Sequence, residues 1–192
     1  MLFCFVKQTN YINLSDDCFN SQRIELEKAA GEESMKRAYE LGFNFEKEYG
    51  SCAQCVFAAV GEALGNGSKE VFKAIDAFAG GLGRSGNGTC GALSGGVAAI
   101  SRRYGREDFH ASRDRDRERC MTLAKLLHDR FVEEYGSILC KDIQKKIMGR
   151  SYDLWDPKDF EEFIAAGGHT IKCPDVVGKA AKWTVGLLSE TG

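Results

Sequence analysis

The sequence predicts an all-α fold, a single-domain helical bundle of about seven helices. Apolar residues recur at helical spacing through most of the 192-residue chain, and no segment alternates apolar and polar residues as a half-buried strand does. The chain contains only two prolines, which agrees with long helices because proline breaks a helix interior. With 43% apolar residues, a chain of this length can bury a sizeable core.

The first half of the chain predicts helices that end at glycine. Residues 22–48 are rich in Glu, Lys, Ala and Leu, and we expect Gly31 to break this helix. Residues 52–64 are apolar on every side, which is typical of a buried helix. Ser68 can cap a helix that runs to residue 79, with Val71, Ile75 and Phe78 facing inward. After a glycine-rich loop, residues 90–104 form the next helix.

The second half predicts further helices. From Arg106 onward, opposite charges alternate along the chain, which favours a helix with a solvated face. We expect this helix to continue to residue 135. We expect the apolar stripe of this helix, formed by Leu123, Leu127 and Phe131, to face inward. Ser137 can cap a helix over 138–148, and Asp156 followed by Pro157 opens a short helix to residue 166. The last helix begins at Cys173, with Cys173 as its N-cap, and runs to residue 188.

The domain organisation follows from the absence of a linker. We expect residues 1–33 to be a poorly defined N-terminal extension and residues 34–192 to be one helical, cysteine-containing domain. The apolar start of the chain has no basic region before it, so it is a poor signal peptide, and we expect a cytoplasmic location. A bundle with this many apolar helices is also compatible with a homodimer.

Composition excludes several classes of partner. The formal net charge is −2, and acidic residues interleave the arginines of residues 102–119, so we expect no nucleic acid and no anionic membrane surface as partner. No apolar run approaches the ~18 residues of a membrane span, so we expect none.

Eight cysteines are the unusual feature of this composition. In a reducing compartment that number indicates metal binding, redox chemistry or core packing, with a disulfide framework still open. Four of them fall at predicted helix starts: Cys52, Cys90, Cys140 and Cys173. Free N–H groups and the positive end of the dipole stabilise a thiolate there, so we expect these thiols to have lowered pKa values. The alternative is that they pack as small apolar side chains.

The other cysteines differ from these four. Cys55 forms a Cys-Ala-Gln-Cys pair with Cys52, which suits either a redox disulfide or two ligands of one metal. Val56 stands where covalent haem attachment requires histidine, so we expect no haem at this pair. Cys120 lies in a helix on an apolar stripe, which predicts core packing. The local sequence assigns no role to Cys4 and Cys18.

The glycine-rich loop matches the pattern G-x-G-x-x-G over residues 81–86. A dinucleotide site needs a strand before this pattern and a βαβ unit around it, so we expect no nucleotide. The loop amides can instead face whatever Cys90 holds, since N–H groups stabilise anionic sulfur. The residues expected around that site are Gly81, Gly83, Arg84, Thr89 and Gly91.

Five motifs in order resemble the C_GCAxxG_C_C family of redox-active proteins. They are Ser-Cys-Ala-Gln at 51–54, Phe-Ala-Gly-Gly-Leu-Gly-Arg at 78–84, Cys-Gly-Ala-Leu-Ser-Gly at 90–95, Gly-Ser-Ile-Leu-Cys at 136–140 and Cys-Pro at 173–174. The resemblance covers residues 34–188. It maps the four family cysteines onto Cys52, Cys90, Cys140 and Cys173, whereas Cys55 and residues 1–33 depart from the family.

The resemblance implies a fold similar to the helical part of split-Soret cytochrome c, which carries an iron–sulfur centre besides its haems. It therefore implies one cluster held by the four cysteines, without haem because the haem-attachment motifs are absent. Family members are often encoded near transporter genes, so it also implies an unidentified redox partner linked to a transport system.

The leading hypothesis is an iron–sulfur cluster of the [2Fe–2S] type, bound by Cys52, Cys90, Cys140 and Cys173 for electron transfer. The ligands are 38, 50 and 33 residues apart, so the fold must assemble the site. One alternative is a thiol–disulfide oxidoreductase that uses Cys52 with Cys55 or Cys90. Others are a structural Cys4 zinc site and a bundle whose thiols are merely packed.

Overall fold

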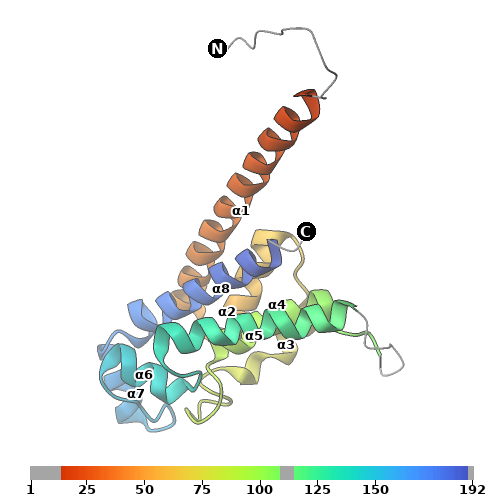
Figure 1. Cartoon of the computed structure of the whole chain (residues 1–192). Coiled ribbons are helices and arrows are strands. Elements are labelled where there is room, and N and C mark those ends of the chain that lie inside the picture. Colours follow the sequence, from red (N-terminus) through yellow and green to blue (C-terminus); the bar gives the residue numbers. More distant parts are fainter. Residues whose placement is uncertain (1–13, 109–114, 190–192) are drawn as a thin grey trace. The chain divides into compact units, whose positions relative to one another are not determined.

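The computed structural model describes residues 14–108 and 115–189, with side chains at residues 29–108 and 116–189. Within these ranges it contains eight α-helices and no strand, which confirms the all-α prediction and a count close to seven (Figure 1). The helices are α1 (Leu14–Tyr49), α2 (Cys52–Leu64), α3 (Lys69–Ala74), α4 (Gly91–Tyr104), α5 (Arg115–Tyr135), α6 (Cys140–Met148), α7 (Pro157–Ala165) and α8 (Cys173–Ser189). Two shorter turns of helix are η1 (Asp76–Phe78) and η2 (Gly168–Lys172).

Helix α1 continues through Gly31, so the expected break there is wrong. A glycine inside a helix costs only about 1 kcal/mol, and the Glu, Ala and Lys residues around it are strong helix formers. By its internal contacts the chain divides into two units, residues 1–30 and 31–192, each described by itself. The expected boundary after residue 33 stays a prediction. Cys4 and the side chain of Cys18 lie outside the described residues.

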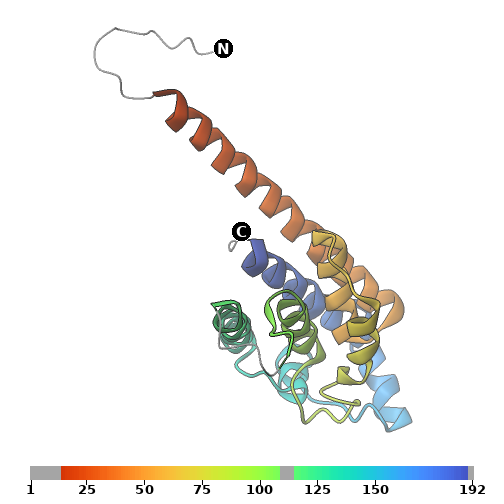
Figure 2. The same cartoon turned by 90° about the vertical axis from the view of Figure 1, so that its right-hand side faces the viewer.

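The core of the 31–192 unit is built by α2, α4 and α8, which pack against one another, while α5 packs against α4 and α8. Figure 2 shows this group from a second side, with α6 and α7 at the end where α8 begins. Small residues permit the close approach of α2 and α4, since Gly95 lies directly against the backbone of Ala53. The core side chains include Val56, Leu127 and Val177, all 0% exposed.

The segment after Ser68 differs from the single helix that its sequence predicts. The Ser68 hydroxyl accepts a hydrogen bond from the Val71 N–H at 3.4 Å, as expected of a cap. The α-helix nevertheless ends at Ala74 and η1 follows, which changes the rotation per residue. Ile75 is therefore buried as expected, whereas Phe78 is 38% exposed and does not face inward.

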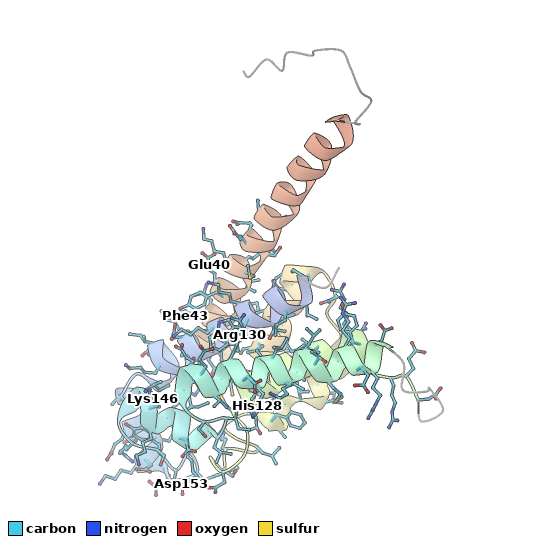
Figure 3. All side chains as sticks on the ribbon, in the orientation of Figure 1. Glu40, Phe43, His128, Arg130, Lys146 and Asp153 are labelled. Carbon is cyan, nitrogen blue, oxygen red and sulfur yellow. The ribbon has the colours of Figure 1, made fainter. Side chains whose placement is uncertain are left out.

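The later helices follow the sequence prediction closely. In α5 the expected inward residues Leu123, Leu127 and Phe131 are buried, and Figure 3 shows Arg130 among the exposed side chains of this helix. Residues 106–108 lie outside the helix, contrary to the expected start at Arg106. Asp156 caps α7 by accepting a hydrogen bond from the Asp159 N–H at 2.8 Å.

Across the ranges that the structure describes, no helix combines the length and the apolar character that a membrane crossing needs.

Replacement of Gly95 by alanine tests the packing of α2 on α4. The new Cβ would overlap the carbonyl oxygen of Ala53 and lie 3.0 Å from its Cα, and backbone cannot move aside cheaply. We expect Gly95→Ala to lower the free energy of unfolding by about 1–3 kcal/mol, measured by urea denaturation and circular dichroism. Gly31→Ala is the matched control, because its Cβ meets nothing within 4 Å. Equal stabilities of the two variants would contradict this packing.

Candidate functional site

Each of the four candidate cysteines lies at the start of a helix, as the sequence predicts. Cys52, Cys140 and Cys173 are the first residues of α2, α6 and α8, and Cys90 is the N-cap of α4. Two starts differ in detail from the expectation. Cys173 follows η2 and is inside its helix rather than capping it. The helix expected from residue 138 begins at Cys140, because Ser137 caps the preceding turn through the Leu139 N–H at 3.1 Å.

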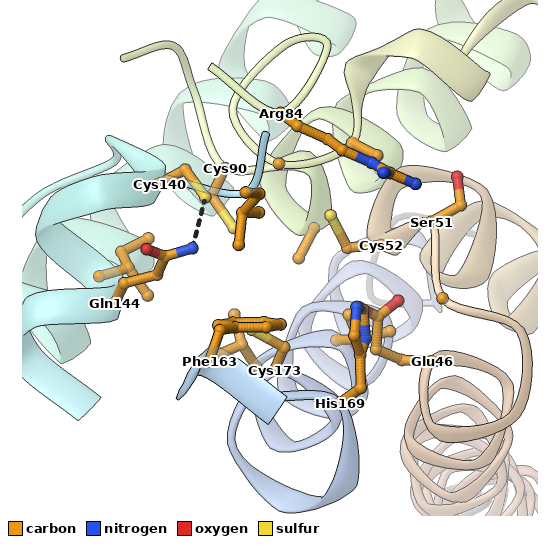
Figure 4. A pocket seen from close by; sticks show the side chains of 18 of the residues that line it. Glu46, Ser51, Cys52, Arg84, Cys90, Cys140, Gln144, Phe163, His169 and Cys173 are labelled. Atoms are coloured by element: carbon orange, nitrogen blue, oxygen red, sulfur yellow. Dashed lines mark hydrogen bonds and ion pairs between the residues drawn. The ribbon is translucent and has the colours of Figure 1, made fainter. Parts of the chain in front are cut away.

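The four cysteines line one cavity with a volume of about 650 Å³ (Figure 4). Cys90 and Cys140 are buried, and Cys52 and Cys173 are partly buried. The backbone fixes two of them beside each other. The Cys90 N–H donates to the carbonyl of Ile138 at 2.8 Å, and the Cys140 N–H donates to the carbonyl of Gly88 at 3.0 Å. These bonds flank an antiparallel bridge between residues 89 and 139.

Glycine is required at two positions that touch the thiols. A Cβ on Gly91 would collide with Sγ of Cys52, and a Cβ on Gly81 would lie 2.6 Å from Cβ of Cys140. Gly81 also has a φ of +68°, which L side chains rarely adopt. The glycine-rich loop therefore lets the backbone approach the cysteines closely, and it runs between helices rather than after a strand.

Hydrogen-bond donors reach three of the four sulfur atoms, those of Cys52, Cys90 and Cys140. Backbone N–H groups of Gly80 and Ala53 lower the pKa of Cys52, and those of Ala92 and Leu93 lower the pKa of Cys90. Nε2 of Gln144 lies 3.8 Å from Sγ of Cys140 and donates to it. The expected roles of Gly83, Thr89 and Gly91 around the site stay predictions. Thr89 forms the bridge to Leu139.

Burial outweighs these donors, so the expected lowering of the thiol pKa values is wrong. Loss of hydration and the charge of Cys140 raise the pKa of Cys90 to about 12, and loss of hydration with the charge of Cys52 raises that of Cys140 to about 12. Loss of hydration also raises the pKa values of Cys52 and Cys173. The charge of the Glu46 carboxylate acts in the same direction on all four thiols.

Glu46 and His169 line the same cavity and were not among the residues that the sequence singles out. Glu46 is 2% exposed, and its Oε1 lies 3.6 Å from Nδ1 of His169. The sequence contains a signal for Glu46, because it continues the spacing of four set by Ala38 and Gly42, which are both buried. His169 lies in η2, a turn with no sequence signature that marks it.

Arg84 also lines the cavity, from the loop side. Its φ is +63°, and its guanidinium carbon lies 6.0 Å from the centre of the Trp155 ring. Trp155 is held in turn by its Nε1–H, which donates to the carbonyl of Gly83 at 2.9 Å. Figure 4 shows the Arg84 side chain directed toward Ser51, a second residue with a left-handed backbone, at φ +64°.

The two remaining described cysteines are not among the residues that line the cavity, although Cys55 adjoins Glu46. Cys55 is 4% exposed, and its Sγ donates to the carbonyl of Gly50 at 2.8 Å. Its pKa is raised by burial and by the neighbouring Glu46 carboxylate. Cys120 is 1% exposed within the core, as its position on the apolar stripe predicts. Neither thiol is in a disulfide.

The cavity cysteines do not form a tight ligand set for one ion. Among the residues that the structure describes, no three His, Cys, Asp or Glu side chains lie close enough together to hold a single metal ion. The four sulfur atoms therefore surround a shared space without meeting at one point.

Comparison with known proteins gives one result. The sequence model of the family described as "Putative redox-active protein (C_GCAxxG_C_C)" matches residues 49–187, well over half of the chain. No curated protein and no solved structure gives a significant match, so the likeness to split-Soret cytochrome c stays a prediction. The matched region includes all four cysteines of the cavity. The chain belongs to the C_GCAxxG_C_C family.

Proposed function

We propose that Cys52, Cys90, Cys140 and Cys173 hold an iron–sulfur cluster of the [2Fe–2S] type and that the protein transfers single electrons. The observation that carries this proposal is the convergence of four free thiols from four separate helix starts on one cavity. Four thiolates are the ligand set that either common cluster needs. When bound, the cluster supplies one-electron chemistry.

A single zinc ion is the alternative occupant for the same four thiolates, and it sets a closer geometry than a cluster does. Zinc binds four thiolates at ~2.3 Å each, which draws all four sulfur atoms around one point. The described side chains include no such group, although the four cysteines share a cavity of about 650 Å³. A cluster has several metal and sulfide atoms between its thiolates, so it fits ligands that stand apart around a space.

The surrounding residues suit an anionic sulfur centre that is shielded from water. Backbone N–H groups point at Cys52 and Cys90, and the Gln144 amide points at Cys140. Such donors stabilise negative charge on sulfur and tune the metal that the sulfur binds. Burial makes isolated thiolates unfavourable here, so iron cations would provide the positive charge that balances them.

Metal analysis of protein purified without oxygen tests the proposal. We expect brown protein that contains iron and acid-labile sulfide, because the four thiols would ligate the cluster directly. Replacement of Cys52, Cys90, Cys140 or Cys173 by serine should each lower the iron and sulfide content by about tenfold or more. Cys120→Ser is the matched control, since this buried thiol lies outside the cavity, and it should retain both.

Two results would contradict the cluster. Colourless protein without iron after reconstitution with iron and sulfide overturns it outright. Stoichiometric zinc with no iron, lost in the same four variants, assigns the cysteines to a structural metal site instead.

Cys55 distinguishes the cluster from thiol–disulfide chemistry. Sγ of Cys55 donates a hydrogen bond to the Gly50 carbonyl, and Cys55 does not line the cavity. We therefore expect the Cys55→Ser variant to retain iron and sulfide. Visible absorption and metal content, compared with those of Cys52→Ser, provide the measurement. A loss as large as in Cys52→Ser shows that Cys55 is a ligand. If the wild-type protein catalyses disulfide exchange and both variants lose this activity, the result would favour the oxidoreductase.

A further inference from the structure

The cavity has a polar part that the four cysteines do not explain. Oε2 of Glu46 and Nδ1 of His169 are both buried and lack a hydrogen-bond partner in the structure. The two side chains lie 3.6 Å apart at Oε1 and Nδ1, which is longer than a hydrogen bond. The pair therefore does not satisfy its own polar atoms, and buried polar atoms in proteins are almost always satisfied. Figure 4 shows both side chains next to the cavity, beside Cys173.

A hydrogen-bond donor can satisfy both of these atoms. A carboxylate only accepts, and a neutral imidazole with its proton on Nε2 presents Nδ1 as an acceptor. An ammonium group carries three donors and a positive charge, so it can bond to both atoms and balance the buried carboxylate. The charge of Glu46 also acts on the four cavity cysteines and raises the pKa of each thiol.

Arg84 provides the complementary charge on the opposite side of this space. Its guanidinium lines the cavity, and none of the described carboxylates lies within ion-pair distance of it. The other nearby acid, Asp76, already accepts a hydrogen bond from the Ser51 hydroxyl at 3.3 Å. Figure 4 shows the guanidinium of Arg84 at the loop side of the cavity, near Ser51, and Glu46 on the other side of Cys52 in this view. A guanidinium in this position suits a carboxylate, which it can bind through two parallel hydrogen bonds.

The dimensions and the walls of the cavity fit a small organic molecule. Its volume of about 650 Å³ lies within the ~300–1,000 Å³ typical of small-molecule sites. Such sites combine apolar walls with a few polar groups that fix orientation. The apolar residues that line the cavity include Leu154, Trp155, Phe160 and Phe163.

We infer that the polar part of the cavity binds an α-amino acid. Its ammonium group donates to Glu46 and His169, its carboxylate accepts from Arg84, and its side chain meets the apolar wall. This site goes beyond the proposed cluster, since none of its three polar residues is a cysteine and it requires no metal.

Calorimetric titration of the full-length protein with each of the twenty standard α-amino acids tests the inference. We expect at least one to bind. The analogue of that amino acid without its amino group, and the analogue without its carboxylate, should each bind about 10- to 100-fold more weakly, as expected when a charge-assisted hydrogen bond is lost. Failure of all twenty to bind overturns the inference, and so does an analogue that binds as tightly as its parent.

Two variants with matched controls assign the residues. Glu46→Gln keeps the shape of the side chain but removes its charge, so binding should weaken about tenfold or more. Glu40→Gln, an exposed position on the same helix that Figure 3 labels, should bind like the wild type. Arg84→Gln should weaken binding similarly, with exposed Arg130→Gln as its control. Arg84 is itself exposed, so this variant keeps the test valid even if Glu46→Gln fails to fold.

Titration of metal-loaded and metal-free protein separates this inference from the cluster. Amino acid binding by colourless protein that takes up no iron would contradict the cluster alone. Brown, iron-containing protein that binds none of the twenty amino acids would contradict the amino acid site alone.

Discussion

The placement of four buried or partly buried thiols and one buried carboxylate around a single cavity is the constraint on which the chemistry of this protein depends. Each of the five groups is acidic, and each thiolate that formed there would repel the others and Glu46. Loss of hydration adds to that cost and raises the pKa of every cavity thiol. Burial therefore favours the neutral thiols, and a cation in the cavity would favour their thiolate forms.

Backbone geometry, rather than long side chains, brings the sulfur atoms together. Two hydrogen bonds beside the 89–139 bridge fix the start of α4 against the start of α6. The loop before α4 then packs on the cysteines so tightly that Gly81 and Gly91 have no room for a Cβ. Because cysteine has a single rotatable bond before its sulfur, the positions of these backbones largely decide where the thiols lie.

Helical periodicity and capping residues could predict the elements and the place of each cysteine at a helix start, since these are local properties. Asp156, for example, caps α7 as its sequence indicates. The thiol pKa values could not be predicted this way, because helix-start donors act locally whereas burial depends on distant elements. Glu46 carries a sequence signal only in its spacing from buried Ala38 and Gly42. His169 and Gln144 are recognised only once α6, α7 and α8 are placed together.

Glu46 connects the two parts of the cavity through its charge. It lies beside His169, and its field reaches all four thiols. A positive group bound against Glu46 therefore weakens the repulsion that a thiolate centre experiences. A more negative centre in turn strengthens the attraction for that positive group. Linkage of binding free energies is reciprocal, so an ammonium ligand in the polar part and negative charge in the sulfur part stabilise each other.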